Sequence, residues 1–146
     1  MIDSFVLLAN VVLVLAMCGG VWLRQLIYYP LLSFVGEDRV PSYQRENRRR
    51  VQLTLQPAQV ITVILAVMLV FWHSASIPAA LPVAGVACEV LVVAATGYEV
   101  PRQRRLETGF SSEVLSQLLA GNWVRVAALS LHAALVVWML TLVMAP

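Results

Sequence analysis

The stretch Arg45–His73, RENRRRVQLTLQPAQVITVILAVMLVFWH, decides the fold of this chain. A basic run opens it, an apolar segment of about 20 residues follows, and Trp72 and His73 close it. A helix of about 20 residues, rising 1.5 Å per residue, crosses the roughly 30 Å hydrocarbon core of a bilayer. Short cytoplasmic loops retain arginine, and tryptophan gathers at membrane interfaces. The stretch therefore predicts a span that begins at the cytoplasmic side and ends outside.

Apolar runs of similar length lie on both sides of this stretch. They predict an all-α fold, an integral membrane antiparallel four-helix bundle with both termini extracytoplasmic. The chain, residues 1–146, is expected to form one domain with spans at 4–29, 54–73, 81–100 and 122–144 and cytoplasmic loops at 30–53 and 101–121.

Local signals refine the expected boundaries. Pro57 is expected in the first turn of the second span, where proline is tolerated, and Pro101 at the end of the third. Ser111 and Ser112 resemble a helix cap, which would open a short amphipathic stretch ahead of the fourth span.

Composition restricts the class of protein. Hydrophobic residues make up 60% of the chain, above the roughly half that is typical of soluble domains. All ten basic residues are arginine, and they lie within or beside two of the three inter-helix connections. No basic stripe with interleaved aromatics is present, so nucleic-acid binding is not expected. The charge pattern indicates a multi-pass protein of a bacterial inner membrane.

Polar residues within the spans fall on single helix faces, as expected for side chains that avoid lipid. Glu89 and His132 each lie roughly 15 Å from the cytoplasmic end of their helices. At that common depth they are expected to meet as a catalytic acid–base or hydrogen-bonding pair, forming the floor of a polar pocket open to the cytoplasmic side. The predicted ligand-binding residues of this pocket are Arg24, Tyr28, Gln56, Gln59, Thr96, Glu99, Asn122 and Arg125.

Simpler interpretations stay open for these residues. Glu99 is also expected as the carboxylate of a structural ion pair with Arg24, Arg102 or Arg125. The two histidines, His73 and His132, lie at different depths, and no motif supplies three metal ligands at helical spacing. The sequence therefore predicts no metal and no cofactor.

Three short motifs carry a family resemblance: Tyr28-Tyr29-Pro30, Pro101 followed by Arg104-Arg105-Leu106, and Asn122-Trp123-Val124-Arg125. With them the chain resembles small bacterial four-helix membrane proteins of the anthrone-oxygenase-like family. The resemblance implies cofactor-independent oxygenation of polycyclic aromatic substrates and marks Pro101, Asn122, Trp123 and Arg125 as family positions. A weaker resemblance is to the membrane-associated eicosanoid and glutathione metabolism family.

Three functions remain open at this stage, and whether a reaction is catalysed is not decided. The first is binding or transformation of a small lipophilic molecule, with oxygenase-like chemistry as one form. The second is an accessory subunit of a larger membrane complex, with a membrane protein or a second copy as partner. The third is a path for protons or small ions along the ionisable residues.

Overall fold

The computed structural model describes residues 2–145, of which helices make up 85%. The first rod consists of α1 (Ile2–Leu23), the π-helical turn η1 (Arg24–Tyr28) and α2 (Tyr29–Leu32). Three single helices follow: α3 (Val40–Phe71), α4 (Ala80–Leu106) and α5 (Ser112–Met144). All four rods are long and apolar enough to cross a membrane.

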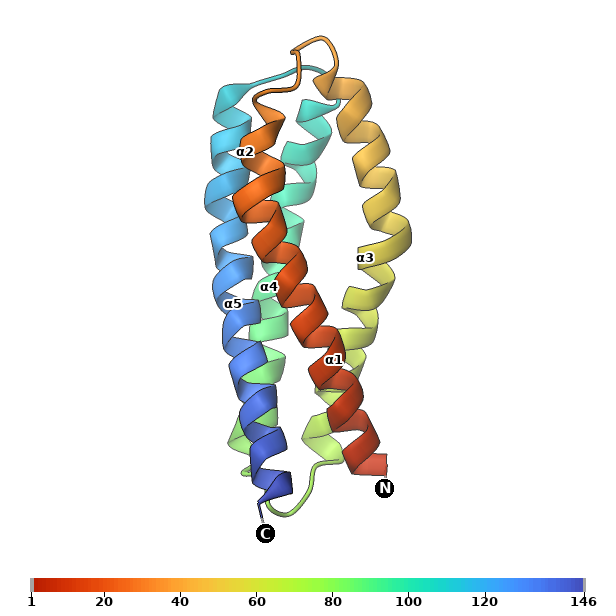
Figure 1. The fold of residues 1–146 in the computed structure, drawn as a ribbon, viewed down its shortest axis with the longest axis vertical. Helices are drawn as coiled ribbons and strands as arrows, with labels where there is room; N and C mark the ends of the chain where they lie inside the picture. Colours follow the sequence, from red (N-terminus) through yellow and green to blue (C-terminus); the bar gives the residue numbers. More distant parts are fainter. Residues whose placement is uncertain (1, 146) are drawn as a thin grey trace.

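The rods lie side by side, and successive rods are joined at alternate ends (Figure 1). Both chain ends lie at one end of the molecule together with the connection 72–79, and we call this the terminal end. The connections 33–39 and 107–111 lie at the opposite end, here called the arginine-rich end. Near its middle, α3 bows away from the other three rods (Figure 1).

The helices extend well into the segments expected as loops. Residues 40–53 belong to α3, and α4 continues through Pro101 to Leu106. The amphipathic stretch after Ser111 is not a separate segment but the first turns of α5. These segments are rich in Arg, Gln and Glu, which are good helix formers. Their polar residues end the apolar run that the sequence shows, but the helix continues through them.

Two local expectations had different outcomes. The Ser111 cap is confirmed, because its hydroxyl oxygen accepts the Val114 backbone N–H at 3.3 Å. The placement of Pro57 in a first turn is wrong, because Pro57 lies in the interior of α3. Proline there has no N–H for the carbonyl of Leu53, which weakens and bends a helix.

The helices pack unevenly, and this leaves space beside α3. At the terminal end, Val14, Leu69 and Val136 belong to an apolar cluster shared by α1, α3 and α5. In contrast, the buried residues of α3 are only Val40, Gln44, Thr62, Ala66 and Leu69. No residue from 45 to 61 is buried, so the middle of α3 does not close the bundle.

Candidate functional site

Glu89 of α4 and His132 of α5 form a buried pair. The Glu89 Oε1 to His132 Nδ1 distance is 2.8 Å, and each residue is 1% exposed. Gln59 of α3 donates its Nε2–H to the other carboxylate oxygen at 2.5 Å. The imidazole lies against Gly85, where a Cβ would be 2.9 Å from Nε2. The predicted meeting of Glu89 and His132 is confirmed, and Gln59 completes the group.

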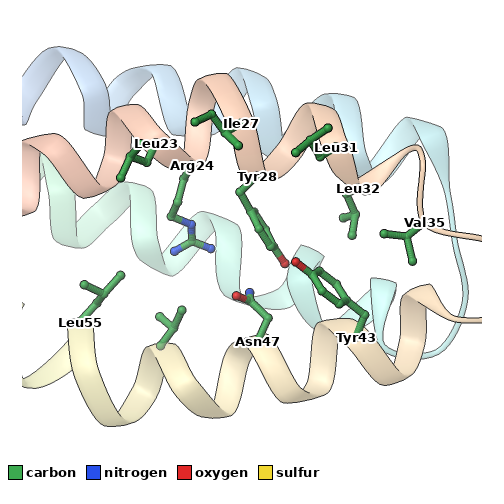
Figure 2. A pocket seen from close by; sticks show the side chains of 11 residues that line it. Leu23, Arg24, Ile27, Tyr28, Leu31, Leu32, Val35, Tyr43, Asn47 and Leu55 are labelled. Atoms are coloured by element: carbon green, nitrogen blue, oxygen red, sulfur yellow. The ribbon is translucent and has the colours of Figure 1, made fainter.

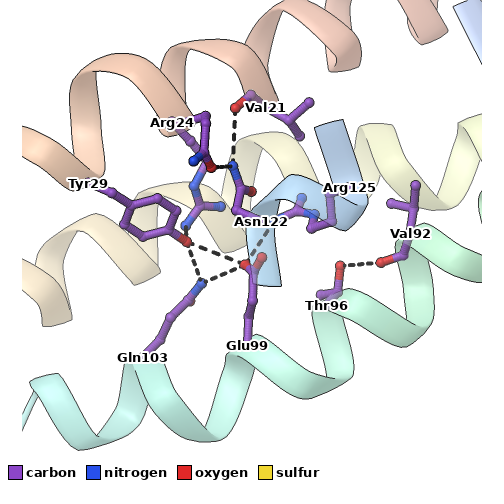
Figure 3. Close-up of polar contacts among 10 residues, drawn as sticks. Val21, Arg24, Tyr29, Val92, Thr96, Glu99, Gln103, Asn122 and Arg125 are labelled. Atoms are coloured by element: carbon purple, nitrogen blue, oxygen red, sulfur yellow. Dashed lines mark hydrogen bonds and ion pairs between the residues drawn. The ribbon is translucent and has the colours of Figure 1, made fainter. Parts of the chain in front are cut away.

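A second polar group lies nearer the arginine-rich end and centres on Glu99 (Figure 3). Glu99 is fully buried, and its Oε2 lies 3.1 Å from Arg125 Nη1, so Arg125 is its ion-pair partner among the three candidates. The Tyr29 hydroxyl also donates to Oε2 at 3.3 Å, and Gln103 Nε2 does so at 3.4 Å. Arg24 donates to the Tyr29 hydroxyl at 3.3 Å. We call these five residues the Glu99 cluster.

The π-helical turn explains why Tyr29, rather than Tyr28, joins this cluster. Regular α-helical spacing puts Tyr28 one turn beyond Arg24 on the same face. In η1 the Tyr29 backbone N–H instead bonds to the Arg24 carbonyl. This wider turn places Tyr29, five positions after Arg24, on the helix face that Arg24 occupies. Tyr28 turns toward α3, where its hydroxyl donates to Gln44 Oε1 at 2.6 Å. Tyr28 therefore lies outside the Glu99 cluster and lines a separate pocket between the first rod and α3.

Asn122 links two rods, whereas Thr96 bonds within its own helix. The Asn122 side-chain amide donates to the Val21 carbonyl at 3.3 Å and to Gln25 Oε1 at 2.8 Å, which joins α5 to the first rod (Figure 3). The Thr96 hydroxyl donates to the carbonyl of Val92 in its own helix. Gln25 and Gln103 were not predicted. The sequence does indicate a contact for Gln103, since it follows Glu99 by four residues, about one helical turn.

A cavity of about 180 Å³ lies beneath the middle of α3 and is lined by residues of all four rods; we call it the inner cavity. Gln59 lines it, whereas Glu89 and His132 do not. The expectation that Glu89 and His132 form the pocket floor is therefore wrong: Glu89 bonds to Gln59, which lines the cavity, but neither member of the pair lines it. The polar side chains around the cavity include Arg24, Gln52, Gln56, Gln59, Thr96, Glu99, Gln103 and Arg125.

Two grooves flank α3 and share residues with the inner cavity. The α1–α3 groove, about 450 Å³, runs from Leu23 and Leu55 toward Val35 and Tyr43 at the arginine-rich end (Figure 2). It shares Arg24, Val51 and Leu55 with the inner cavity. The α3–α4 groove, about 480 Å³, is lined by Gln52, Gln56, Pro57, Gln59, Val60, Val93 and Thr96.

Several buried polar atoms beside the inner cavity have no hydrogen-bond partner among the described residues. They include Glu99 Oε1, Arg125 Nε and Gln59 Oε1. A buried polar group without a partner costs about 1 to 3 kcal/mol, so native proteins satisfy nearly all of them with protein, water or ligand. The three residues line one cavity, and each has one buried polar atom that the described protein leaves without a partner.

Within residues 2–145, no group of three or more His, Cys, Asp or Glu side chains has the arrangement of a metal site. The side chains of the site carry amide, guanidinium, carboxylate, phenol and imidazole groups. Comparisons with protein-family models, curated proteins and solved structures find no match. Fold and site together define a class, an all-helical chain with four rods suited to a membrane and a polar cavity between them.

Proposed function

We propose that this protein is a multi-pass protein of a bacterial inner membrane that binds a small lipophilic molecule in the inner cavity. Its arginine-rich end faces the cytoplasm and both termini lie outside, as the retention of arginine in cytoplasmic loops favours. One observation carries the proposal: Glu99, Arg125 and Gln59 present unpartnered buried atoms beside one cavity. Polar groups that converge in a concave, membrane-embedded site are typical of ligand binding.

The same observation favours ligand binding over the two alternatives. An accessory subunit gains nothing from unpartnered buried groups, which only lower stability unless something fills the space. A proton path needs polar groups along the whole bundle. Toward the terminal end, α1 buries the polar side chain of Asn10, and the cluster that includes Val14, Leu69 and Val136 fills the surrounding space with apolar side chains.

The resemblance to the anthrone-oxygenase-like family suggests polycyclic aromatic compounds as the first ligands to examine, and oxygenation as the reaction to assay. Glu89 and His132 are better suited to hold Gln59 than to contact a ligand, since Gln59 separates them from the inner cavity. A catalytic role for the pair stays a prediction.

Filling the cavity tests the proposal. Gln56 lines the inner cavity and makes no side-chain hydrogen bond within the described chain, so Gln56→Trp fills space without removing such a bond. We expect it to reduce the lipophilic compound that copurifies from native membranes by about tenfold, which corresponds to about 1.4 kcal/mol. Mass spectrometry of extracts from equal amounts of folded protein measures this.

Leu53→Trp is the matched control, because Leu53 lies on the same helix, is 69% exposed and lines neither the inner cavity nor the grooves. It should retain the compound. If wild-type protein carries no small molecule and none of a panel of lipophilic compounds raises its melting temperature, the proposed function is refuted.

A further inference from the structure

The inner cavity carries an excess of positive charge. Its lining includes four arginines, Arg24, Arg48, Arg104 and Arg125, but only one carboxylate, Glu99. Glu99 pairs with Arg125, and Glu107 pairs with Arg48. Arg24 and Arg104 form no ion pair within residues 2–145. Arg104 is exposed, whereas Arg24 is half-buried and Arg125 is buried. The excess of guanidinium over carboxylate groups favours an anionic group, most strongly beside Arg24 and Arg125, where contact with bulk water is reduced.

Two of the unused donors belong to residues that lie close to Glu99. Arg125 is 7% exposed, and its Nε has no partner in the described chain. Arg24 donates one bond, to the Tyr29 hydroxyl, and also lies over the Tyr28 and Tyr29 rings. Guanidinium groups bind carboxylates and phosphates through paired hydrogen bonds. Arg24, which lines the cavity and donates a single bond, therefore retains donors for an anion, and the Arg125 guanidinium lies beside the same cavity.

The inner cavity is too small for a whole lipophilic molecule. Its volume of about 180 Å³ lies below the roughly 300 to 1,000 Å³ of sites that enclose drug-sized ligands. The remainder of such a ligand must occupy a connected space. The α3–α4 groove, about 480 Å³, is suitable because it shares Gln52, Gln56, Gln59 and Thr96 with the cavity.

Depth in the bilayer distinguishes the two grooves. Counting back from Phe71, where α3 ends, roughly 30 Å of hydrocarbon corresponds to about 20 residues and reaches residue 51. The part of α3 that lines the α3–α4 groove, Gln52 to Val60, lies within that depth. Tyr43 and Asn47 of the α1–α3 groove lie beyond it, at the level of the lipid headgroups or outside. The α3–α4 groove thus faces the acyl chains.

We propose that the ligand is a lipophilic anion: its carboxylate or similar acidic head lies in the inner cavity beside Arg24 and Arg125, and its apolar body leaves through the α3–α4 groove. This inference rests on the proposed function and specifies its ligand class and route. Val60 and Val93, which are 58% and 52% exposed, flank the opening to lipid.

Matched probe pairs test the charge of the head. Purified protein in a neutral detergent is titrated with palmitate and with hexadecanol, and with 2-anthracenecarboxylate and 2-anthracenemethanol, by native mass spectrometry. We expect each acid to bind about tenfold more tightly than its alcohol. Arg24→Gln should remove most of this difference, Arg24→Lys should keep part of it, and Arg45→Gln should leave it unchanged, because Arg45 is exposed and lines neither the cavity nor the grooves.

Two variants test the route. Val93→Trp should weaken binding of the preferred acid by about tenfold, whereas Val90→Trp should not, since Val90 is similarly exposed on α4 but lies outside the groove. If Ile27→Trp in the α1–α3 groove weakens binding and Val93→Trp does not, the route is overturned.

The outcomes separate this inference from the proposed function. If acids and alcohols bind equally and Arg24→Gln has no effect, the charge inference fails while lipophilic binding stands. If phosphatidylglycerol binds and excludes both acids, the occupant is a two-chain lipid and the inference is wrong. If no probe binds, the proposed function fails as well.

Discussion

At the scale of single residues, the Glu89–His132 pair depends on the absence of a side chain at position 85. The imidazole occupies the space that a Cβ of residue 85 would need, and it thereby aligns Nδ1 with Glu89. Through Glu89 the arrangement extends to Gln59, which lines the inner cavity. One methyl group at position 85 is therefore expected to disturb three helices.

Gly85→Ala should lower the free energy of unfolding by about 1 to 3 kcal/mol, the usual cost of adding a methyl group to a packed interior. Its control is Gly97→Ala on the same helix, where a Cβ meets nothing within 4 Å. That change should be neutral or slightly stabilising, since alanine favours helix over glycine. Thermal unfolding in detergent compares the two. Equal melting temperatures would mean that His132 is not held against Gly85.

At the scale of elements, two departures from regular α-helix border the inner cavity. The turn η1 places Tyr29 at Glu99 and turns Tyr28 to Gln44. Pro57 is exposed and lies inside α3, the helix that bows away from the other rods near its middle (Figure 1). Prolines inside membrane helices are tolerated when the freed backbone groups find other partners. We interpret the π-helical turn and the bow of α3 as the two irregularities that make room for a cavity between the rods.

Pro57→Ala tests this interpretation for α3. Alanine restores the N–H that bonds to the Leu53 carbonyl, so we expect the free energy of unfolding to rise by about 1 to 3 kcal/mol. A straighter α3 should also exchange bound ligand more slowly. Thermal unfolding and ligand dissociation rates measure the two effects. Thr54→Ala, beside the bow, serves as a control, and a destabilised Pro57→Ala protein would contradict the interpretation.

At the scale of the whole molecule, three rods form a closely packed unit and α3 completes it only near its ends. Gln44 meets Tyr28 at the arginine-rich end, and Thr62, Ala66 and Leu69 are buried toward the terminal end. The sequence predicted four apolar helices and the meeting of Glu89 with His132 because hydropathy and helical phase are local properties. It could not predict Tyr29 at Glu99, which depends on the π-helical turn, nor the cavity, which depends on how α3 packs.

Membrane orientation is also a property of the whole molecule. If the arginine-rich end lies in the cytoplasm as proposed, Ser76→Cys in the connection 72–79 should react with a membrane-impermeant maleimide added to intact cells. Thr108→Cys in the opposite connection should react only after the cells are permeabilised. Both positions are exposed. The unsubstituted chain, with Cys18 and Cys88 in the membrane helices, gives the background, and the reverse pattern would invert the orientation.

The apolar cluster at the terminal end has a consequence for how a ligand could enter and leave the protein. Val14, Leu69 and Val136 close the bundle there, and the inner cavity connects with grooves only in the other half. If the proposed ligand enters through the α3–α4 groove, we expect it to exchange with one leaflet of the bilayer, the one at the level of that groove.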